Sequence, residues 1–275
     1  GEGTMMTRTA MRSTGTVGCV AEPVSTVRSV DLDGTLVAAG HQPEYLPYLG
    51  FLAKMFESDV FVIVDHVQFE KKGWQSRNRI LGKSGVVVLS VPVRTKGRFE
   101  QCISEVEIAA GEVWRRKHWR SIRAAYQDAP GFKEHGAFFE WVYGQPWESL
   151  LALNMAVITY LRSAFTITTP VIYSSGLDLG TVRKTELLIA ICKATGCGAY
   201  LSGRGAAVYL DEERLGAAGI EARFTGFNHP VYDQGKHPFV PNMSALDMLF
   251  RHPHSAPRLL ADSLDVSRGV EGVWR

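Results

Sequence analysis

The fold is decided by residues 36–80, which read LVAAGHQPEYLPYLGFLAKMFESDVFVIVDHVQFEKKGWQSRNRI. Leu36 to Ala39 is a short apolar run, and Val60 to Val64 is an unbroken one, as in strands buried on both faces. Between them, apolar residues recur at helical spacing from Leu46 to Phe56. The order strand, helix, strand predicts a βαβ unit with two parallel strands.

Polar side chains follow both strands of this unit. His41 and Gln42 come after the first strand, where Pro43 makes the chain turn. Asp65 and Gln68 come after the second strand. Because ligands of open α/β sheets bind at the carboxyl ends of the strands, we expect these four side chains to face one crevice.

Strand and helix patterns alternate again in the second half of the chain. Val171 to Ser174 and Ala199 to Ser202 have strand character, and Thr181 to Thr195 has the pattern of a helix ended by Gly196. Ile220 to Phe224 indicates a further strand. This alternation predicts a three-layer α/β fold with a mostly parallel, Rossmann-like sheet.

One domain is predicted over residues 35–252. It carries a helical insert at about 110–165, where apolar residues recur at helical spacing. Residues 1–34 are rich in Thr, Ser, Gly and Val without a sustained period, so we expect a poorly ordered N-terminal extension. Residues 253–275 are assigned to a C-terminal tail.

The composition argues against several classes of protein. The 275 residues are 45% hydrophobic, which is enough to bury a substantial core. The 30 Lys and Arg residues nearly balance the 28 Asp and Glu residues, so neither nucleic acid nor an anionic membrane is an expected partner. The four cysteines lack CxxC spacing, which favours reduced thiols in the cytoplasm, and no apolar run reaches the length of a membrane span. A small-molecule substrate is the expected partner, and a homodimer is left open.

A series of polar and aromatic motifs runs through residues 36–252. In chain order they are His41-Gln42-Pro43, Tyr45-Leu46-Pro47, Leu49-Gly50-Phe51, Asp65, Val67-Gln68-Phe69, Arg77-Asn78-Arg79, Tyr200-Leu201-Ser202-Gly203, Tyr209-Leu210, His229-Pro230, Tyr232, Gln234, Pro241-Asn242, Ser244, Leu246-Asp247 and Leu249-Phe250. Together these motifs resemble the WbqC-like family. Members of that family sit among genes for surface-polysaccharide and specialised-metabolite assembly, and the resemblance implies a transferase.

The chain departs from the pattern of that family at two positions. Glu44 stands where the family commonly has Asn or a similar small polar residue, and His66 stands where it has a second Asp. These departures indicate that the substrate of this chain differs from those of its relatives.

We interpret the protein as a small-molecule transferase that moves an acyl or aminoacyl group to an amine or hydroxyl. His41 is predicted to act as general base or oxyanion donor, and Asp65 to orient it or to act as the nucleophile. Arg77 and Arg79 are predicted to lie on a polar loop that follows Asp65 and to hold an anionic group there, beside Trp74, which suits a ring. The other predicted substrate-binding residues are Gln42, Tyr45, Gln68, Asn78, Ser202, Gly203, His229, Tyr232, Gln234 and Asp247.

Two other functions are left open. The layout of strand, His-containing turn, helix and strand is similar to nucleotidyltransferases with a HIGH motif, which implies an ATP-dependent ligase that forms an acyl-adenylate. Residues 41–44 lack the second histidine and the glycine of that motif, so the analogy concerns the fold alone. A non-catalytic ligand-binding or scaffold component of a biosynthetic complex is the second alternative.

Two further patterns have weaker support. Asp31 to Thr35 matches the DxDGT motif of haloacid-dehalogenase-type phosphatases, but a convincing strand before it and a metal site after it are missing. The histidines at 229, 237, 252 and 254 fit no recognised zinc spacing. No metal site is therefore predicted, and the sequence does not identify a cofactor.

Overall fold

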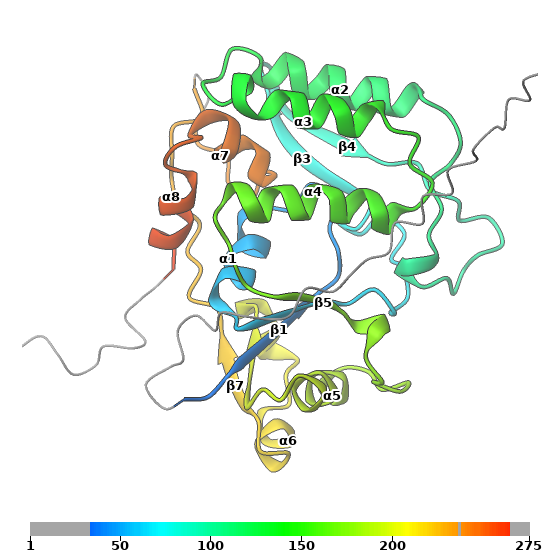
Figure 1. Cartoon of the computed structure of the whole chain (residues 1–275), viewed down its shortest axis with the longest axis vertical. Coiled ribbons are helices and arrows are strands. Elements are labelled where there is room, and N and C mark those ends of the chain that lie inside the picture. The colour runs from blue at the N-terminus through cyan, green and yellow to red at the C-terminus, as the bar shows by residue number, and fades with distance from the viewer. Residues whose placement is uncertain (1–33, 236–237, 265–275) are drawn as a thin grey trace, which may run out of the picture.

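The computed structural model of the chain describes residues 34–235 and 238–264. Within them, five strands form one sheet in the order β5-β2-β1-β6-β7, and every pairing in it is parallel (Figure 1). This confirms the predicted three-layer, Rossmann-like α/β class. The strands of this sheet are β1 (Val37–His41), β2 (Val60–Ile63), β5 (Val171–Tyr173), β6 (Ala199–Ser202) and β7 (Glu221–Phe224).

The chain order of the strands reverses between β1 and β6. β1 pairs with β2 on one side, where Ala38 lies opposite Val60, and with β6 on the other, where Val37 lies opposite Ala199. In open α/β sheets such a switch point leaves a crevice outside the carboxyl ends of the strands. Gly40 allows the close packing here, because a Cβ at this position would lie 2.9 Å from the Tyr200 hydroxyl.

Helices cover both faces of the sheet. Figure 1 shows α1 and α4 on one face, with α2 and α3 beyond them, and α5 and α6 on the opposite face. The larger hydrophobic core lies on the α1 side, and a smaller one, which includes Ile189 and Leu215, lies under α5 and α6. The helices are α1 (Leu49–Glu57), α2 (Val113–Tyr126), α3 (Phe132–Gly144), α4 (Leu150–Ala164), α5 (Thr185–Thr195), α6 (Glu212–Ala217), α7 (Ala245–Arg251) and α8 (Ala256–Asp262). Short 3-10 helices are η1 (Ile103–Glu105), η2 (Ser174–Gly176) and η3 (Arg204–Val208).

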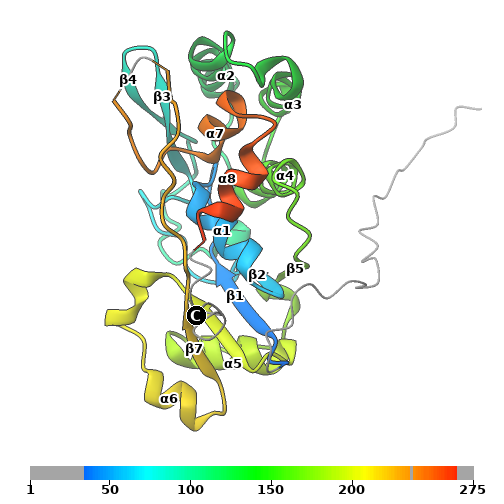
Figure 2. The ribbon, with the colours of Figure 1, turned by 90° about the vertical axis from the view of Figure 1, so that its left-hand side faces the viewer.

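A separate antiparallel hairpin stands beside α2, away from the main sheet (Figure 2). Its strands are β3 (Arg77–Gly82) and β4 (Gly85–Ser90). Arg77 and Arg79 do not lie on a polar loop as predicted, because they begin a strand that pairs with β4. Alternation along β3 buries Asn78 and Ile80 and leaves the two arginines on the other face.

The end of the described chain holds α8, within residues 253–275, which the sequence analysis assigned to a tail. Pro257 stands at the start of this helix, where its fixed φ is compatible with helix, and Leu260 is fully buried. The prolines around His252 and His254 therefore mark the start of a helix that packs on the core.

Candidate functional site

A cavity of about 290 Å³ lies beyond the carboxyl end of β1. It is built by the loop after β1, the turn before α1, the β3–β4 hairpin and the loop before α7. The residues that line it are Glu44, Tyr48, Trp74, Asn78, Arg79 and Asn242. Two of the predicted site residues, Asn78 and Arg79, are thus in its wall.

Glu44 and His41 face each other at the base of this site. The Oε1 atom of Glu44 lies 3.7 Å from the Nε2 atom of His41, and the Glu44 side chain is 7% exposed. The Nδ1–H of His41 donates a 2.9 Å hydrogen bond to the carbonyl of Gln42, because a carbonyl can only accept. The lone pair of Nε2 is therefore directed to the side on which Glu44 lies, and the ring edge packs on Phe51.

Burial shifts the pKa values of three groups here, in each case in the direction that favours the uncharged form. It raises the pKa of Glu44 to about 7, although the Tyr48 backbone N–H and the charge of Lys54 act in the opposite direction. Burial lowers the pKa of His41 to about 4, and Lys54 contributes to that shift. Burial also lowers the pKa of Lys54 to about 8, against the attraction of Glu44. Groups that titrate near pH 7 are suited to proton transfer.

Two arginines of β3 lie against the ring of Trp74. The Cζ atoms of Arg77 and Arg79 are each 5.4 Å from the centre of that ring, a cation–π distance. Arg79 also donates a 3.2 Å hydrogen bond to the carbonyl of Asn242. Within residues 34–235 and 238–264 neither arginine forms a salt bridge, so their positive charges are not neutralised by a carboxylate of this part of the chain.

Buried amides hold the loops around the cavity. Asn154 of α4 donates to the carbonyls of Pro43 and Gln75, at 3.2 and 2.8 Å, and so joins the loop after β1 to the loop of Trp74. Gln75 also donates to the side chain of Gln42. Asn78 donates to the carbonyl of Tyr45, at 3.0 Å. The Asn78 side chain therefore fixes the backbone of the loop after β1, whereas the Gln42 side chain is bound to that of Gln75.

Tyr45 is fully buried under the cavity rather than exposed in it. Its hydroxyl is hydrogen-bonded to His118 Nδ1 at 2.8 Å and to the Tyr143 hydroxyl at 2.5 Å. Burial lowers the pKa of His118 to about 4, so this imidazole is neutral at pH 7. The cluster joins the loop after β1 to α2 and α3.

Asp65 and Gln68 occupy the carboxyl end of β2, next to β5. Asp65 accepts hydrogen bonds from the Ser174 hydroxyl and from the backbone and hydroxyl of Ser175, at 2.7–3.0 Å. Gln68 donates to the carbonyl of Phe99. The carboxylate beside His41 is thus that of Glu44, while Asp65 caps the turn after β5.

Ser202 and Gly203 lie at the carboxyl end of β6, on the other side of the switch point. Ser202 is buried, and its carbonyl accepts a hydrogen bond from the backbone N–H of Thr225. The Gly203 carbonyl accepts one from the backbone N–H of Ala206, within η3. Neither residue lines the cavity. Their predicted part in substrate binding stays a prediction.

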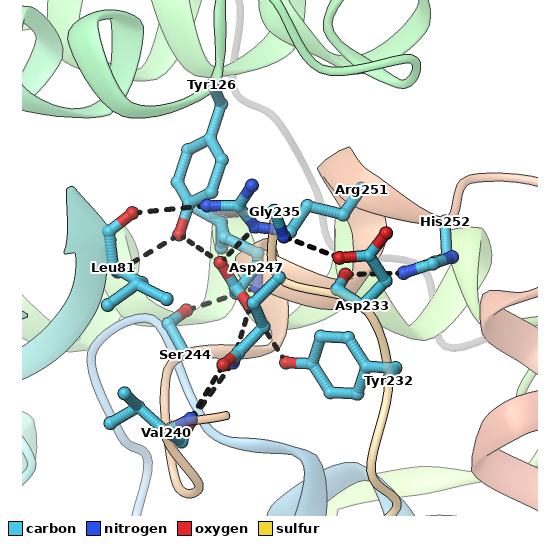
Figure 3. Close-up of polar contacts among 12 residues, drawn as sticks. Leu81, Tyr126, Tyr232, Asp233, Gly235, Val240, Ser244, Asp247, Arg251 and His252 are labelled. Atoms are coloured by element: carbon cyan, nitrogen blue, oxygen red, sulfur yellow. Dashed lines mark hydrogen bonds and ion pairs between the residues drawn. The ribbon is translucent and has the colours of Figure 1, made fainter. Parts of the chain in front are cut away.

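Asp247 is the centre of a buried polar network (Figure 3). Its Oδ1 atom accepts from the Tyr126 hydroxyl at 3.0 Å and from Arg251 Nε at 2.8 Å. Its Oδ2 atom accepts from the Tyr232 hydroxyl and from Gln234 Nε2, both at 3.0 Å. These side chains, three of them predicted to bind substrate, therefore use their polar atoms to bind one another.

His229 connects this region to the cavity. Its Nδ1–H donates to the Pro230 carbonyl, and its Nε2 accepts a 3.1 Å hydrogen bond from the backbone N–H of Asn242. Asn242 has a φ of 60°, in the left-handed region that Asn tolerates better than most residues. His229 on one side and Arg79 on the other thus fix a cavity-lining residue.

Sequence reasoning missed Lys54 and Tyr48 as parts of the site, and it treated Glu44 only as a departure from a motif. A signal was present for Lys54, because it is a charged residue within an otherwise apolar stretch of helical pattern. Among the described residues, no group of three or more His, Cys, Asp or Glu side chains is placed to hold a metal ion. None of the helices in that part of the chain is long and apolar enough to cross a membrane.

Comparison with known proteins shows the family of this chain. The chain matches the WbqC-like protein family over residues 42–259, which include the lining of the cavity. The chain belongs to this family. It is 33% identical over 223 residues to a Mycobacterium tuberculosis protein named "Uncharacterized protein Rv1507c", an alignment that covers 80% of this chain and 95% of that protein. No solved structure matches the chain.

Proposed function

We propose that this WbqC-like protein is a transferase that moves an acyl or aminoacyl group from a small-molecule donor to an amine or hydroxyl. The observation that carries the proposal is the composition of the cavity. An acid with a pKa of about 7, Glu44, and the non-neutralised guanidinium of Arg79 line one cavity of about 290 Å³. Proton transfer and anion binding are the two tasks that such a reaction requires.

In the proposed reaction the amine or hydroxyl attacks the acyl carbon of the donor. A bond forms between the nucleophile and that carbon, and the bond from the carbon to the leaving group breaks. Glu44, protonated when the anionic donor is bound, gives its proton to the leaving group and, as carboxylate, then accepts the proton of the nucleophile. His41, neutral at pH 7, has its Nε2 atom 3.7 Å from Glu44, where this nitrogen can accept a hydrogen bond from that carboxyl when it is protonated. Arg77 and Arg79 hold an anionic group of the donor.

The setting of the reaction is proposed on two grounds. Surface-polysaccharide or specialised-metabolite biosynthesis is the setting that the family resemblance implies. The described cysteines Cys102, Cys192 and Cys197 are all free thiols, which supports a reducing compartment such as the cytoplasm.

The test is a ligand screen followed by a transfer assay. The purified protein is heated with acyl and aminoacyl donors, nucleotide sugars, ATP and divalent metals, and each shift in melting temperature is recorded. A donor at about 100 times its Kd should stabilise the fold by roughly 2.7 kcal/mol. Product from that donor and an amine acceptor is then measured by mass spectrometry, and Glu44→Gln and His41→Ala should lose it while they keep the fold.

Controls separate the site from general effects. Arg77→Ala should remove the stabilisation by the donor, whereas Arg116→Ala, an exposed arginine on α2, should not. A donor that stabilises the wild type and all variants equally would contradict the proposed site. If no compound of the panel shifts the melting temperature, that result would favour the scaffold alternative.

An ATP-dependent ligase is the second candidate, and one observation favours it. His41 ends the first strand of a doubly wound parallel sheet, next to its switch point, where nucleotides bind in such folds. Stabilisation by ATP that disappears in His41→Ala, with release of pyrophosphate in the presence of an acid, would replace the transferase proposal.

A further inference from the structure

The cavity places an acid and a cation within reach of each other. Glu44 and Arg79 line the same space of about 290 Å³, which as a sphere is about 8 Å across, less than the roughly 10 Å over which charges interact at ordinary ionic strength. A negative ligand beside Arg79 therefore also lies within the field of Glu44. If Glu44 is ionised, it opposes that ligand, and if it is protonated, it does not.

We infer that the cavity is an anion-binding site whose occupation is coupled to the uptake of one proton by Glu44. The anion is a carboxylate or a tetrahedral oxyanion, such as the charged group of an acyl donor. The inference rests on the proposed function for its biological meaning. Binding of an anionic donor would leave Glu44 protonated, which is the state in which it can act as an acid in the proposed reaction. The anion site itself is independent of which group is transferred.

The groups that face Glu44 support this coupling. His41 of β1 lies 3.7 Å away, and the positive charge of Lys54, on α1, lowers the pKa of Glu44. Tyr48 donates its backbone N–H to Glu44, and Arg79 lines the same cavity. Lys54 donates to the carbonyl of Gly40 at 2.7 Å and is not among the residues that line the cavity.

These groups titrate in separate ranges. Between pH 5.5 and 7.5, His41, with a pKa of about 4, stays neutral, and Lys54, with a pKa of about 8, stays mostly protonated. Glu44, with a pKa of about 7, is the group that changes charge in this interval. A change in anion affinity across it is therefore assigned to Glu44.

Sulfate is the probe, because its own charge does not change over this range. Binding is measured by isothermal titration calorimetry on the full chain at pH 5.5, 6.5 and 7.5, each in two buffers with different ionisation enthalpies. We expect sulfate to bind several-fold more weakly at pH 7.5 than at pH 5.5, and the buffer dependence at pH 7.5 to show proton uptake that approaches one per sulfate. The buffer comparison needs no variant, so it holds even if a substitution prevents folding.

Variants identify the residue that takes up the proton and the residue whose positive charge binds the anion. Glu44→Gln, which keeps the shape of the protonated acid, should bind sulfate with an affinity that does not change from pH 5.5 to 7.5. Glu70→Gln removes the same charge from an exposed site and should retain the wild-type pH dependence. Arg79→Met should weaken binding at least tenfold at every pH, and Arg116→Met should not.

Three results would overturn the inference: no sulfate binding at any pH, an affinity that is flat with pH in the wild type, or a pH dependence that survives in Glu44→Gln. Its failure is distinct from failure of the transferase proposal. A donor that stabilises the protein without proton uptake would contradict the proton coupling and leave the transferase proposal intact. Sulfate binding with proton uptake, but no transfer from any donor, would contradict the transferase proposal and leave the coupling intact.

Discussion

Glu44 is a buried acid, and its burial lowers the stability of the folded protein at the pH values where the unfolded chain ionises it. Its pKa is raised from the model-peptide value of 4.5 to about 7, so the folded protein holds a proton that the unfolded chain releases between those values. The contribution to stability is full below pH 4.5 and is lost as pH rises through 7. Functional sites are where such unfavourable burial is expected.

Replacing Glu44 by Gln should therefore stabilise the protein in a pH-dependent way. The free energy of unfolding of Glu44→Gln minus that of the wild type should grow between pH 4.5 and 8 by an amount on the order of 3 kcal/mol, the equivalent of a shift of about 2.5 pKa units. Urea denaturation at a series of pH values measures it. The titration of His41 is present in both proteins, so it largely cancels in the difference.

The matched control is Glu70→Gln, whose side chain is exposed on the loop before Trp74. Its difference from the wild type should stay nearly constant over the same range of pH. A Glu44→Gln difference that is equally flat would show that Glu44 titrates as an ordinary surface acid, and would also remove its proposed part in proton transfer.

Asn154 shows how one buried residue of α4 positions two loops. A buried Asn in an apolar helix needs hydrogen-bond partners, and Asn154 has them in the carbonyls of Pro43 and Gln75. Asn154→Leu leaves two buried carbonyls without that donor, at 1–3 kcal/mol each. We expect it to lower the free energy of unfolding by about 3 kcal/mol and to abolish sulfate binding, as measured by denaturation and calorimetry.

Thr159→Leu is the control for that substitution, because it places the same residue on an exposed face of the same helix. It should leave both measurements close to those of the wild type. If Asn154→Leu retains full sulfate affinity, the two loops do not depend on this residue for their positions.

The loop before α7 is held by the network around Asp247, and this bears on three predicted site residues. Tyr232→Phe removes one of the four side-chain donors to Asp247, so it should lower the free energy of unfolding by about 1–2 kcal/mol. Because Tyr232 does not line the cavity, sulfate affinity should stay within twofold of the wild type. Loss of binding with unchanged stability would instead support the prediction that Tyr232 reads the substrate.

The elements differ in how far the sequence could predict them. Val60 to Ile63 was predictable as a buried parallel strand because a run of β-branched and aromatic residues has few other solutions. The start of β3 was missed because its polar residues have no strand pattern, and only pairing with β4 makes it extended. The proximity of Glu44 to His41 and Lys54 depends on the turn between two prolines, which local propensity does not specify.

At the scale of the whole molecule, one central sheet joins two layers of unequal size. The cavity lies beyond the carboxyl end of its first strand, so the sheet must stay intact for the site to exist. The described tryptophans all belong to the loop before β3 and the helical region on the larger side, at positions 74, 114, 119, 141 and 147. When Trp274, which lies outside the described residues, is replaced by Phe, tryptophan fluorescence therefore reports on one side of the sheet, whereas circular dichroism reports on both.

Ile191, which is fully buried in α5 on the smaller side, tests whether the two sides unfold together. Ile191→Ala creates a cavity that should lower the free energy of unfolding by about 3 kcal/mol. If the shared sheet couples the layers, tryptophan fluorescence and far-ultraviolet circular dichroism should shift to the same lower urea midpoint. Lys193→Ala, exposed on the same helix, should shift neither. A fluorescence midpoint that stays at the wild-type value while circular dichroism shifts would mean that the α5 layer unfolds alone. The cavity would then persist after that layer has unfolded.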